Sequence, residues 1–181
     1  KVISRYRSYH GGTGHAMAAS AQTAWKWKFE PFAPGFIHVT PPARPGCAAC
    51  ARLNGCSLAC VDLIEQAIVE EHEETVAAVI AEPIMLSAGV QVPHPDYFPR
   101  LREICDKHNV LLIFDEIITG FGRTGHLFAA EYFGVWPDIL SCGKGISGGY
   151  APLSAILIDD KVAQAFWGEP EAGVQFWAGH T

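Results

Sequence analysis

The sequence predicts an α/β domain with a mostly parallel sheet, and two observations support this prediction. Short runs of consecutive apolar residues, typical of strands that are buried on both faces, recur along the second half of the chain. Between them, apolar residues recur at helical spacing. Strands that alternate with helices are typical of a parallel sheet. Ligands of such sheets bind beyond the carboxyl ends of the strands, so the residues after each run are the candidate functional residues.

The composition favours one globular domain over residues 1–181, because 49% of the residues are hydrophobic and 18% are charged. A net charge of −6 and the absence of any Lys/Arg run argue against a nucleic-acid surface. No apolar stretch reaches the roughly 18–20 residues of a membrane span, and the chain opens without a signal peptide. We therefore expect a cytoplasmic protein. The chain lacks an initiator Met and a terminal helix, so we also expect it to be a fragment.

Six segments are expected to form strands. In chain order they are residues 2–5, 36–39, 76–81, 110–114, 138–141 and 152–158. Residues 25–56 are rich in Trp, Pro, Cys and Gly and show no clear period, so a long connection is expected around the second strand.

Three helices are expected between and after these strands. The first covers residues 57–72 and is capped by Ser57, Asp96 caps the second, and Asp159 caps a last helix over residues 161–166. The apolar face of the second helix is Leu101, Ile104, Cys105 and His108.

Polar side chains follow four of the expected strands. They are Tyr9 and His10, Glu82, Asp115 and Glu116, and Lys144. A carboxylate such as Asp115 at the end of an apolar strand is partly desolvated and needs a cation or several donors. It could be a helix cap, half of an ion pair, or the magnesium ligand of a nucleotide hydrolase. The last function requires a Gly-x-x-x-x-Gly-Lys-Ser/Thr loop, and Gly145 stands where Ser or Thr would follow Lys144.

Lys144 lies between two glycines after an expected strand. It is either a solvated surface lysine or a lysine in a partly apolar pocket, where the amine becomes a nucleophile toward aldehydes. Asp115 and such a lysine are the minimum set for pyridoxal chemistry. The lysine forms the imine, and the carboxylate keeps the pyridine nitrogen protonated so that the ring acts as an electron sink.

The stretch 111–125, Leu-Leu-Ile-Phe-Asp-Glu-Ile-Ile-Thr-Gly-Phe-Gly-Arg-Thr-Gly, closely resembles the signature of class III aminotransferases, which are fold-type-I pyridoxal-phosphate enzymes. The resemblance continues, in family order, at residues 9–11, 81–84, 137–145, 149–153 and 179–181. It spans nearly the whole chain except residues 25–56. It implies the three-layer α/β large domain of that fold, with an N-terminal segment and a C-terminal small domain outside residues 1–181.

The resemblance also implies roles for individual residues. Lys144 resembles the catalytic lysine that forms the Schiff base with pyridoxal 5'-phosphate and moves a proton between Cα and the cofactor C4′. Asp115 resembles the partner of the pyridine nitrogen. Tyr9 looks like the aromatic residue that stacks on one face of the ring, with Ile117 on the other face.

Three further residues are assigned to the cofactor by resemblance alone. His10 and Glu82 are expected near the cofactor in positioning roles, although Glu82 could instead form a structural ion pair. Thr181 looks like the hydroxyl that contacts the phosphate held by the neighbouring subunit. The resemblance thus implies a homodimer with the active site at the interface.

Two departures from well-known members bear on the substrate. Ile118 stands where many members have Gln, and Ser87 stands where ornithine- and GABA-type members have the Glu that pairs with a substrate-reading Arg. This favours an amine or amino acid and pyruvate over 2-oxoglutarate. Decarboxylation, racemisation or an aminomutase shift on the same scaffold remains an alternative, as does a non-catalytic truncated or metal-binding module.

Four of the six cysteines, Cys47, Cys50, Cys56 and Cys60, are close together in the sequence. Four thiolates can surround Zn²⁺. However, Cys60 falls within an expected helix and the spacing lacks two Cys-x2-Cys pairs. Free cysteine is also a common small core residue, so no metal is expected.

Overall fold

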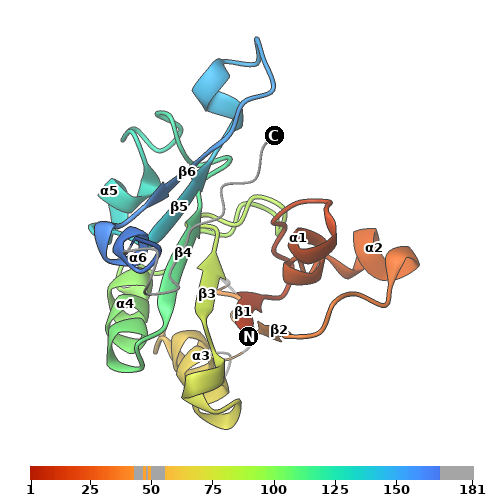
Figure 1. Ribbon diagram of the computed structural model, residues 1–181, viewed down its shortest axis with the longest axis vertical. Helices are drawn as coiled ribbons and strands as arrows, with labels where there is room; N and C mark the ends of the chain where they lie inside the picture. Colours follow the sequence, from red (N-terminus) through yellow and green to blue (C-terminus); the bar gives the residue numbers. More distant parts are fainter. Residues whose placement is uncertain (43–46, 48, 50–55, 168–181) are drawn as a thin grey trace.

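A six-stranded sheet forms the centre of the computed structural model, which describes residues 1–42, 47, 49 and 56–167 (Figure 1). The strand order is β2-β1-β3-β4-β5-β6. The strands are β1 (Val2–Arg5), β2 (Phe36–Val39), β3 (Ala78–Ala81), β4 (Leu111–Asp115), β5 (Ile139–Cys142) and β6 (Ala155–Ile158). The first five are parallel, and β6 pairs antiparallel with β5. The predicted α/β class and all six expected strands are therefore confirmed, although β3 and β6 are shorter than expected and β4 and β5 are shifted by one residue.

Helices connect the strands. They are α1 (Gly14–Ala19), α2 (Thr23–Lys26), α3 (Ala59–Glu70), α4 (Tyr97–Lys107), α5 (Ala129–Phe133) and α6 (Asp160–Gln164), with short 3-10 turns η1 (Trp27–Phe29), η3 (Glu73–Thr75) and η4 (Lys144–Ser147). Figure 1 shows α1 beside β1 and β2, with α2 farther from the sheet on the same side. Among the described residues, no helix combines the length and apolar character that a membrane span needs.

The three predicted helix caps have different outcomes. The Ser57 cap is wrong, because α3 begins after Leu58, whose backbone is left-handed (φ 60°) and whose carbonyl accepts from the Val61 amide at 2.7 Å. Asp96 does occupy the N-cap position of α4, but its side chain makes no capping hydrogen bond. The Asp159 cap is confirmed, since its carboxylate accepts from the Lys161 amide at 2.9 Å.

The core lies between the sheet and the apolar faces of α3 and α4. Leu112 and Phe114 of β4 are fully buried, as are Ile64 of α3 and Leu101 of α4. The Phe98 ring packs edge-on against Phe114, with the ring centroids 4.8 Å apart. This packing fixes β4, and it therefore fixes the position of the residues at the carboxyl end of β4.

His108, at the end of α4, joins three elements. Its Nδ1 lies 2.6 Å from the Glu73 carboxylate in η3, and its Nε2 lies 3.2 Å from the Glu65 carboxylate in α3. The hydrogen bond to Glu73 raises the pKa of His108 above its ordinary value of 6.5, and the bond to Glu65 acts in the same direction against a burial effect that lowers it. A protonated imidazole donates from both nitrogens, so both contacts favour the charged form.

The His108 contacts should make stability depend on pH. Because the folded-state pKa is raised, the stabilisation is fully present below the unfolded-state pKa and is lost as the pH rises through the folded-state pKa. We expect His108→Gln to lower the free energy of unfolding more at pH 6 than at pH 9, as measured by urea denaturation of the purified protein. The control is His126→Gln, whose imidazole is half-exposed and 3.9 Å from Glu131. An equal loss at both pH values for His108→Gln would contradict this prediction.

Candidate functional site

A cavity of about 230 Å³ lies at the carboxyl ends of β1, β3, β4 and β5. Its lining residues are Tyr9, His10, Gly11, Glu82, Ile84, Asp115, Ile117, Ile118, Thr119 and Lys144. Every site residue that the sequence predicts within the described ranges is in this set. Segments that are more than 100 residues apart in the sequence therefore meet where the α/β topology predicts a ligand site.

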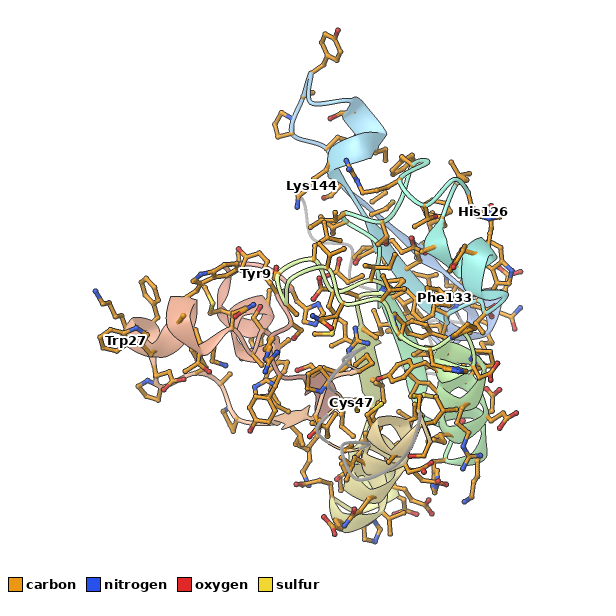
Figure 2. All side chains as sticks on the ribbon, turned by 180° about the vertical axis from the view of Figure 1, so that it is seen from behind. Tyr9, Trp27, Cys47, His126, Phe133 and Lys144 are labelled. Atoms are coloured by element: carbon orange, nitrogen blue, oxygen red, sulfur yellow. The ribbon has the colours of Figure 1, made fainter. Side chains whose placement is uncertain are left out.

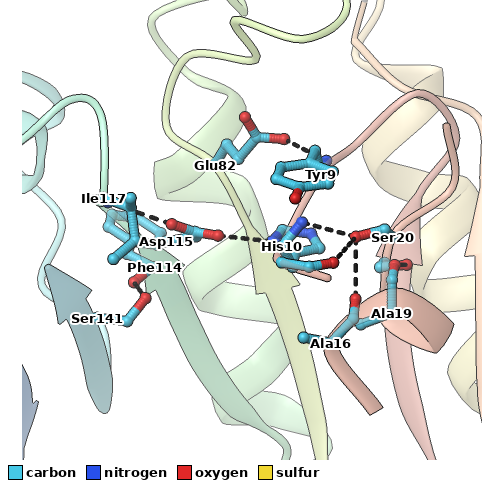
Figure 3. A network of polar contacts seen from close by, with 12 residues as sticks. Tyr9, His10, Ala16, Ala19, Ser20, Glu82, Phe114, Asp115, Ile117 and Ser141 are labelled. Carbon is cyan, nitrogen blue, oxygen red and sulfur yellow. Dashed lines mark hydrogen bonds and ion pairs between the residues drawn. The ribbon is translucent and has the colours of Figure 1, made fainter. Parts of the chain in front are cut away.

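Asp115, the last residue of β4, is buried at the base of this group (Figure 3). One carboxylate oxygen lies 2.8 Å from His10 Nδ1, and the other accepts from the Ile117 amide at 3.2 Å. The side chains of Asp115 and His10 are only 9% and 2% exposed. The carboxylate is thus held from two sides, and each oxygen keeps lone pairs for a further donor.

His10 is fixed in turn by the chain that follows β1. Its amide donates to Ser20 Oγ at 2.7 Å, and Ser20 Oγ donates to the Ala16 carbonyl at 2.9 Å (Figure 3). Ser20 directly follows α1, which packs against β1 and β2. The orientation of the Asp115 carboxylate therefore depends on contacts that reach α1.

Glu82 follows β3 and holds the backbone of Tyr9. Its carboxylate accepts from the Tyr9 amide at 3.1 Å, and its carbonyl accepts from Arg5 Nη2 at 2.5 Å. Burial raises the pKa of Glu82, and the Tyr9 amide and the charge of Arg5 oppose this effect. Glu82 thus connects the ends of β1 and β3, and these contacts oppose the cost of burying its carboxylate.

Lys144 begins η4, and Gly143 separates it from the end of β5. The contacts of its two neighbours explain why both are glycines. Its backbone is left-handed (φ 44°), and its side chain lies at the exposed side of the cavity (Figure 2). A Cβ on Gly145 would lie 2.9 Å from Phe121 Cβ, and a Cβ on Gly143 would lie 3.0 Å from Ile117 Cδ1. The glycines therefore allow the segment after β4 to approach the lysine closely.

The described side chains around this cavity include the amine of Lys144, the buried carboxylates of Asp115 and Glu82, and the ring of Tyr9. Over residues 1–179, the chain matches the family model for class-III aminotransferases. The chain belongs to the class-III aminotransferase family. Members of this family depend on pyridoxal 5'-phosphate, and the set of side chains around the cavity fits that cofactor. The predicted family, fold and cofactor are confirmed.

Known aminotransferases resemble this chain over almost its entire length. An uncharacterised aminotransferase, YhxA of Bacillus subtilis, is 41% identical over 172 residues, which are 93% of this chain and 37% of that protein. Taurine–pyruvate aminotransferase of Bilophila wadsworthia is 38% identical over 93% of this chain and 37% of its own length. A PLP-bound amine transaminase from an uncultivated Pseudomonas species is 36% identical, with a TM-score of 0.87 over 92% of this chain and 38% of that chain. The chain thus spans little more than a third of these relatives.

Glu116 has a structural role that the sequence did not reveal. It is fully buried, and its carboxylate accepts from the amides of Ala129 and Ala130 at 2.7 and 2.8 Å and from the Thr119 hydroxyl at 2.9 Å. Burial raises its pKa, and the three donors oppose this effect. Glu116 therefore links the segment after β4 to the first turn of α5. Only its position directly after Asp115 hinted at a role.

Two residues named in the sequence analysis lie outside the described ranges. They are Thr181, assigned to the cofactor phosphate, and Cys50 of the cysteine cluster. Cys47 and Cys56 form no disulfide, and Cys60 is buried in α3. Within the described parts of the chain, no group of three or more His, Cys, Asp or Glu side chains is arranged to hold a metal ion.

Proposed function

We propose that the protein is an aminotransferase that moves an amino group between an amine or amino acid and an oxo acid. The observation that carries this proposal is that Lys144 and the buried Asp115 line the same cavity. When it is bound, pyridoxal 5'-phosphate supplies an electron sink that stabilises negative charge at the substrate Cα.

Lys144 and Asp115 have complementary tasks in this proposal. The Lys144 amine would bind the aldehyde carbon of the cofactor and would move a proton between the substrate Cα and the cofactor C4′. The Asp115 carboxylate holds the proton on the pyridine nitrogen. The 2.8 Å contact with His10 keeps that carboxylate in one orientation.

The other lining residues orient the cofactor ring. Tyr9 and Ile117, which both line the cavity, would flank the ring on opposite faces and so fix its plane relative to the bond that is to be broken. Glu82 supports Tyr9 through the backbone amide. The apolar side chains of Ile84 and Ile117 exclude water from the reacting atoms.

We also propose pyruvate rather than 2-oxoglutarate as the amino acceptor. Ser87 has no carboxylate with which to orient a substrate-reading arginine, and its carbonyl accepts from Gln22 Nε2 at 2.6 Å. Ile118, which lines the cavity, replaces a glutamine. The similarity to a protein named taurine–pyruvate aminotransferase supports the same acceptor.

An acceptor comparison tests this function. The purified protein is loaded with pyridoxal phosphate and an amine donor, and alanine formed from pyruvate is compared with glutamate formed from 2-oxoglutarate. We expect kcat/KM to be at least roughly tenfold higher for pyruvate, since a site without a partner for the second carboxylate leaves that charge unpaired. A preference for 2-oxoglutarate would contradict the acceptor. Carbon dioxide release or racemisation without any acceptor would contradict transamination itself.

The assembly is a further part of the proposal. We propose that residues 1–181 belong to the cofactor-binding large domain of a cytoplasmic homodimer, with the active site at the subunit interface. Thr181 would then contact the phosphate held by the neighbouring subunit. Sedimentation equilibrium of the holoenzyme is the direct test, and a fully active monomer would contradict this arrangement.

A further inference from the structure

The ring of Tyr9 has few restraints of its own. The Tyr9 amide is held by Glu82, but the side chain is 37% exposed. No hydrogen bond to its hydroxyl is found among the described residues. A ring that covers a cofactor needs a fixed tilt, so a packing partner has to supply the restraint that hydrogen bonds do not.

Trp25 is that packing partner. The ring centroids of Tyr9 and Trp25 are 5.4 Å apart, and the ring planes meet at 78°. This edge-to-face geometry is one of the two that the charge distribution of aromatic rings favours. Trp25 approaches from α2, so the contact joins the cavity to a segment that does not line it.

The helix that carries Trp25 is anchored at both ends. At its start, Gln22 Nε2 donates to the Ser87 carbonyl at 2.6 Å. At its end, Lys26 is buried, its ammonium donates to the Ser20 carbonyl at 2.7 Å, and it lies 5.0 Å from the centre of the Phe32 ring. A helix of four residues is not stable by itself, and these contacts at its two ends hold Trp25 in a fixed position.

Ser20 connects the two halves of this arrangement. Its carbonyl receives the Lys26 ammonium, while its hydroxyl accepts from the amide of His10 (Figure 3). The backbone next to Tyr9 and the helix that carries Trp25 are thus held by one residue. Ser20 therefore helps to fix the distance between the Tyr9 and Trp25 rings.

We propose that Trp25 is a positioning residue, which holds the Tyr9 ring at the tilt that stacking on the cofactor requires. This inference rests on the proposed function, because it assumes that Tyr9 covers the pyridoxal ring. Trp25 acts through Tyr9 and contacts neither the cofactor nor the substrate in this proposal.

The same segment provides a matched control. Trp27 is 58% exposed, close to the 53% of Trp25, and its ring lies under the Lys28 ammonium at 5.2 Å. Within the described residues it makes no ring contact with Tyr9. Figure 2 shows Trp27 at the outer end of the segment, away from Tyr9. Trp25→Leu and Trp27→Leu therefore make the same change of side chain, but only Trp25→Leu removes the ring contact with Tyr9.

A first readout needs no cofactor. Tetranitromethane nitrates exposed tyrosines, and Tyr132, which is 53% exposed and packs on Phe133, serves as the internal reference. In the unloaded protein, we expect Trp25→Leu to raise the ratio of Tyr9 to Tyr132 nitration roughly two- to tenfold, the range that loss of an aromatic pair implies. Trp27→Leu should leave the ratio unchanged. Trp25→Phe keeps an aromatic ring at this position, so its ratio should be close to that of the unchanged protein.

A second readout uses the holoenzyme. We expect Trp25→Leu to raise the dissociation constant of pyridoxal phosphate roughly two- to tenfold and to weaken the visible circular dichroism of the bound cofactor. Trp25→Phe should behave nearly as the unchanged protein does. If Trp25→Leu and Trp27→Leu behave alike in a protein that binds the cofactor on Lys144, the inference alone is overturned. If the unchanged protein does not bind the cofactor, the proposed function and the inference both fail.

Discussion

Replacement of Lys144 by alanine is expected to abolish covalent retention of pyridoxal phosphate and nearly all turnover. Lys144 is the lysine that lines the cavity beside Asp115. The loss of kcat should be on the order of 10⁴- to 10⁶-fold, by analogy with the removal of a nucleophile that other groups cannot replace. The measurement is single-turnover transfer from an amine donor, together with the cofactor content after gel filtration.

Two companion variants make the Lys144 result specific. Lys144→Arg keeps the positive charge but cannot form the bond to the cofactor, so it should be as inactive as Lys144→Ala. Lys28→Ala removes an exposed lysine that lies over Trp27, and it should keep full activity. Turnover by Lys144→Ala within tenfold of the unchanged protein would assign the chemistry to another group.

Asp115→Asn is expected to lower kcat by about 10²- to 10³-fold while the cofactor remains bound to Lys144. The amide cannot hold a proton on the pyridine nitrogen, so the electrostatic stabilisation of charge at the substrate Cα is lost. The contacts to His10 and Ile117 place the carboxylate at this point in the fold. Stopped-flow absorbance of the first half-reaction measures the loss directly.

The control for this result is Asp160→Asn, which changes an exposed aspartate in the first turn of α6. It should have no effect on the half-reaction. A rate for Asp115→Asn equal to that of the unchanged protein would show that the pyridine nitrogen has no need of this carboxylate. A protein that fails to fold after Asp115→Asn would be recognised by its unfolding curve.

The sheet was predictable because its strands leave a strong local signal. Residues 110–114 are apolar throughout, and a strand buried on both faces requires such a run. The extra residues at 76–77 could not be excluded from β3 in advance, because the strand begins only where pairing with β1 begins, at Ala78. Strand ends are therefore set by neighbours that the local sequence does not specify.

The helices α1, α2 and α5 were not predicted, for a related reason. The segment 14–19 consists mostly of small residues and has no amphipathic period. It is held by contacts such as the Ser20 hydroxyl on the Ala16 carbonyl, and α5 is held by Glu116. Helices this short gain most of their stability from tertiary contacts. The Ser57 cap failed because the left-handed turn at Leu58 has no signal in the residue type.

The candidate site was predictable to the extent that its residues follow strands. Asp115 is the last residue of β4 and Lys144 comes shortly after β5, and parallel topology brings such positions to one edge. The link between Asp115 and His10 was not predictable, since it joins residues that are 105 positions apart. The contact of Trp25 with Tyr9 was also hidden, because residues 25–56 show no period that would orient a side chain.

Mapping the covalent attachment of the cofactor tests the central proposal most directly. The purified protein is loaded with pyridoxal phosphate and reduced with borohydride, and its peptides are analysed by mass spectrometry. The geometry of the cavity predicts a single adduct, on Lys144, which is lost in Lys144→Ala. No adduct in a folded protein, or an adduct on another lysine such as Lys26, would contradict the proposed site.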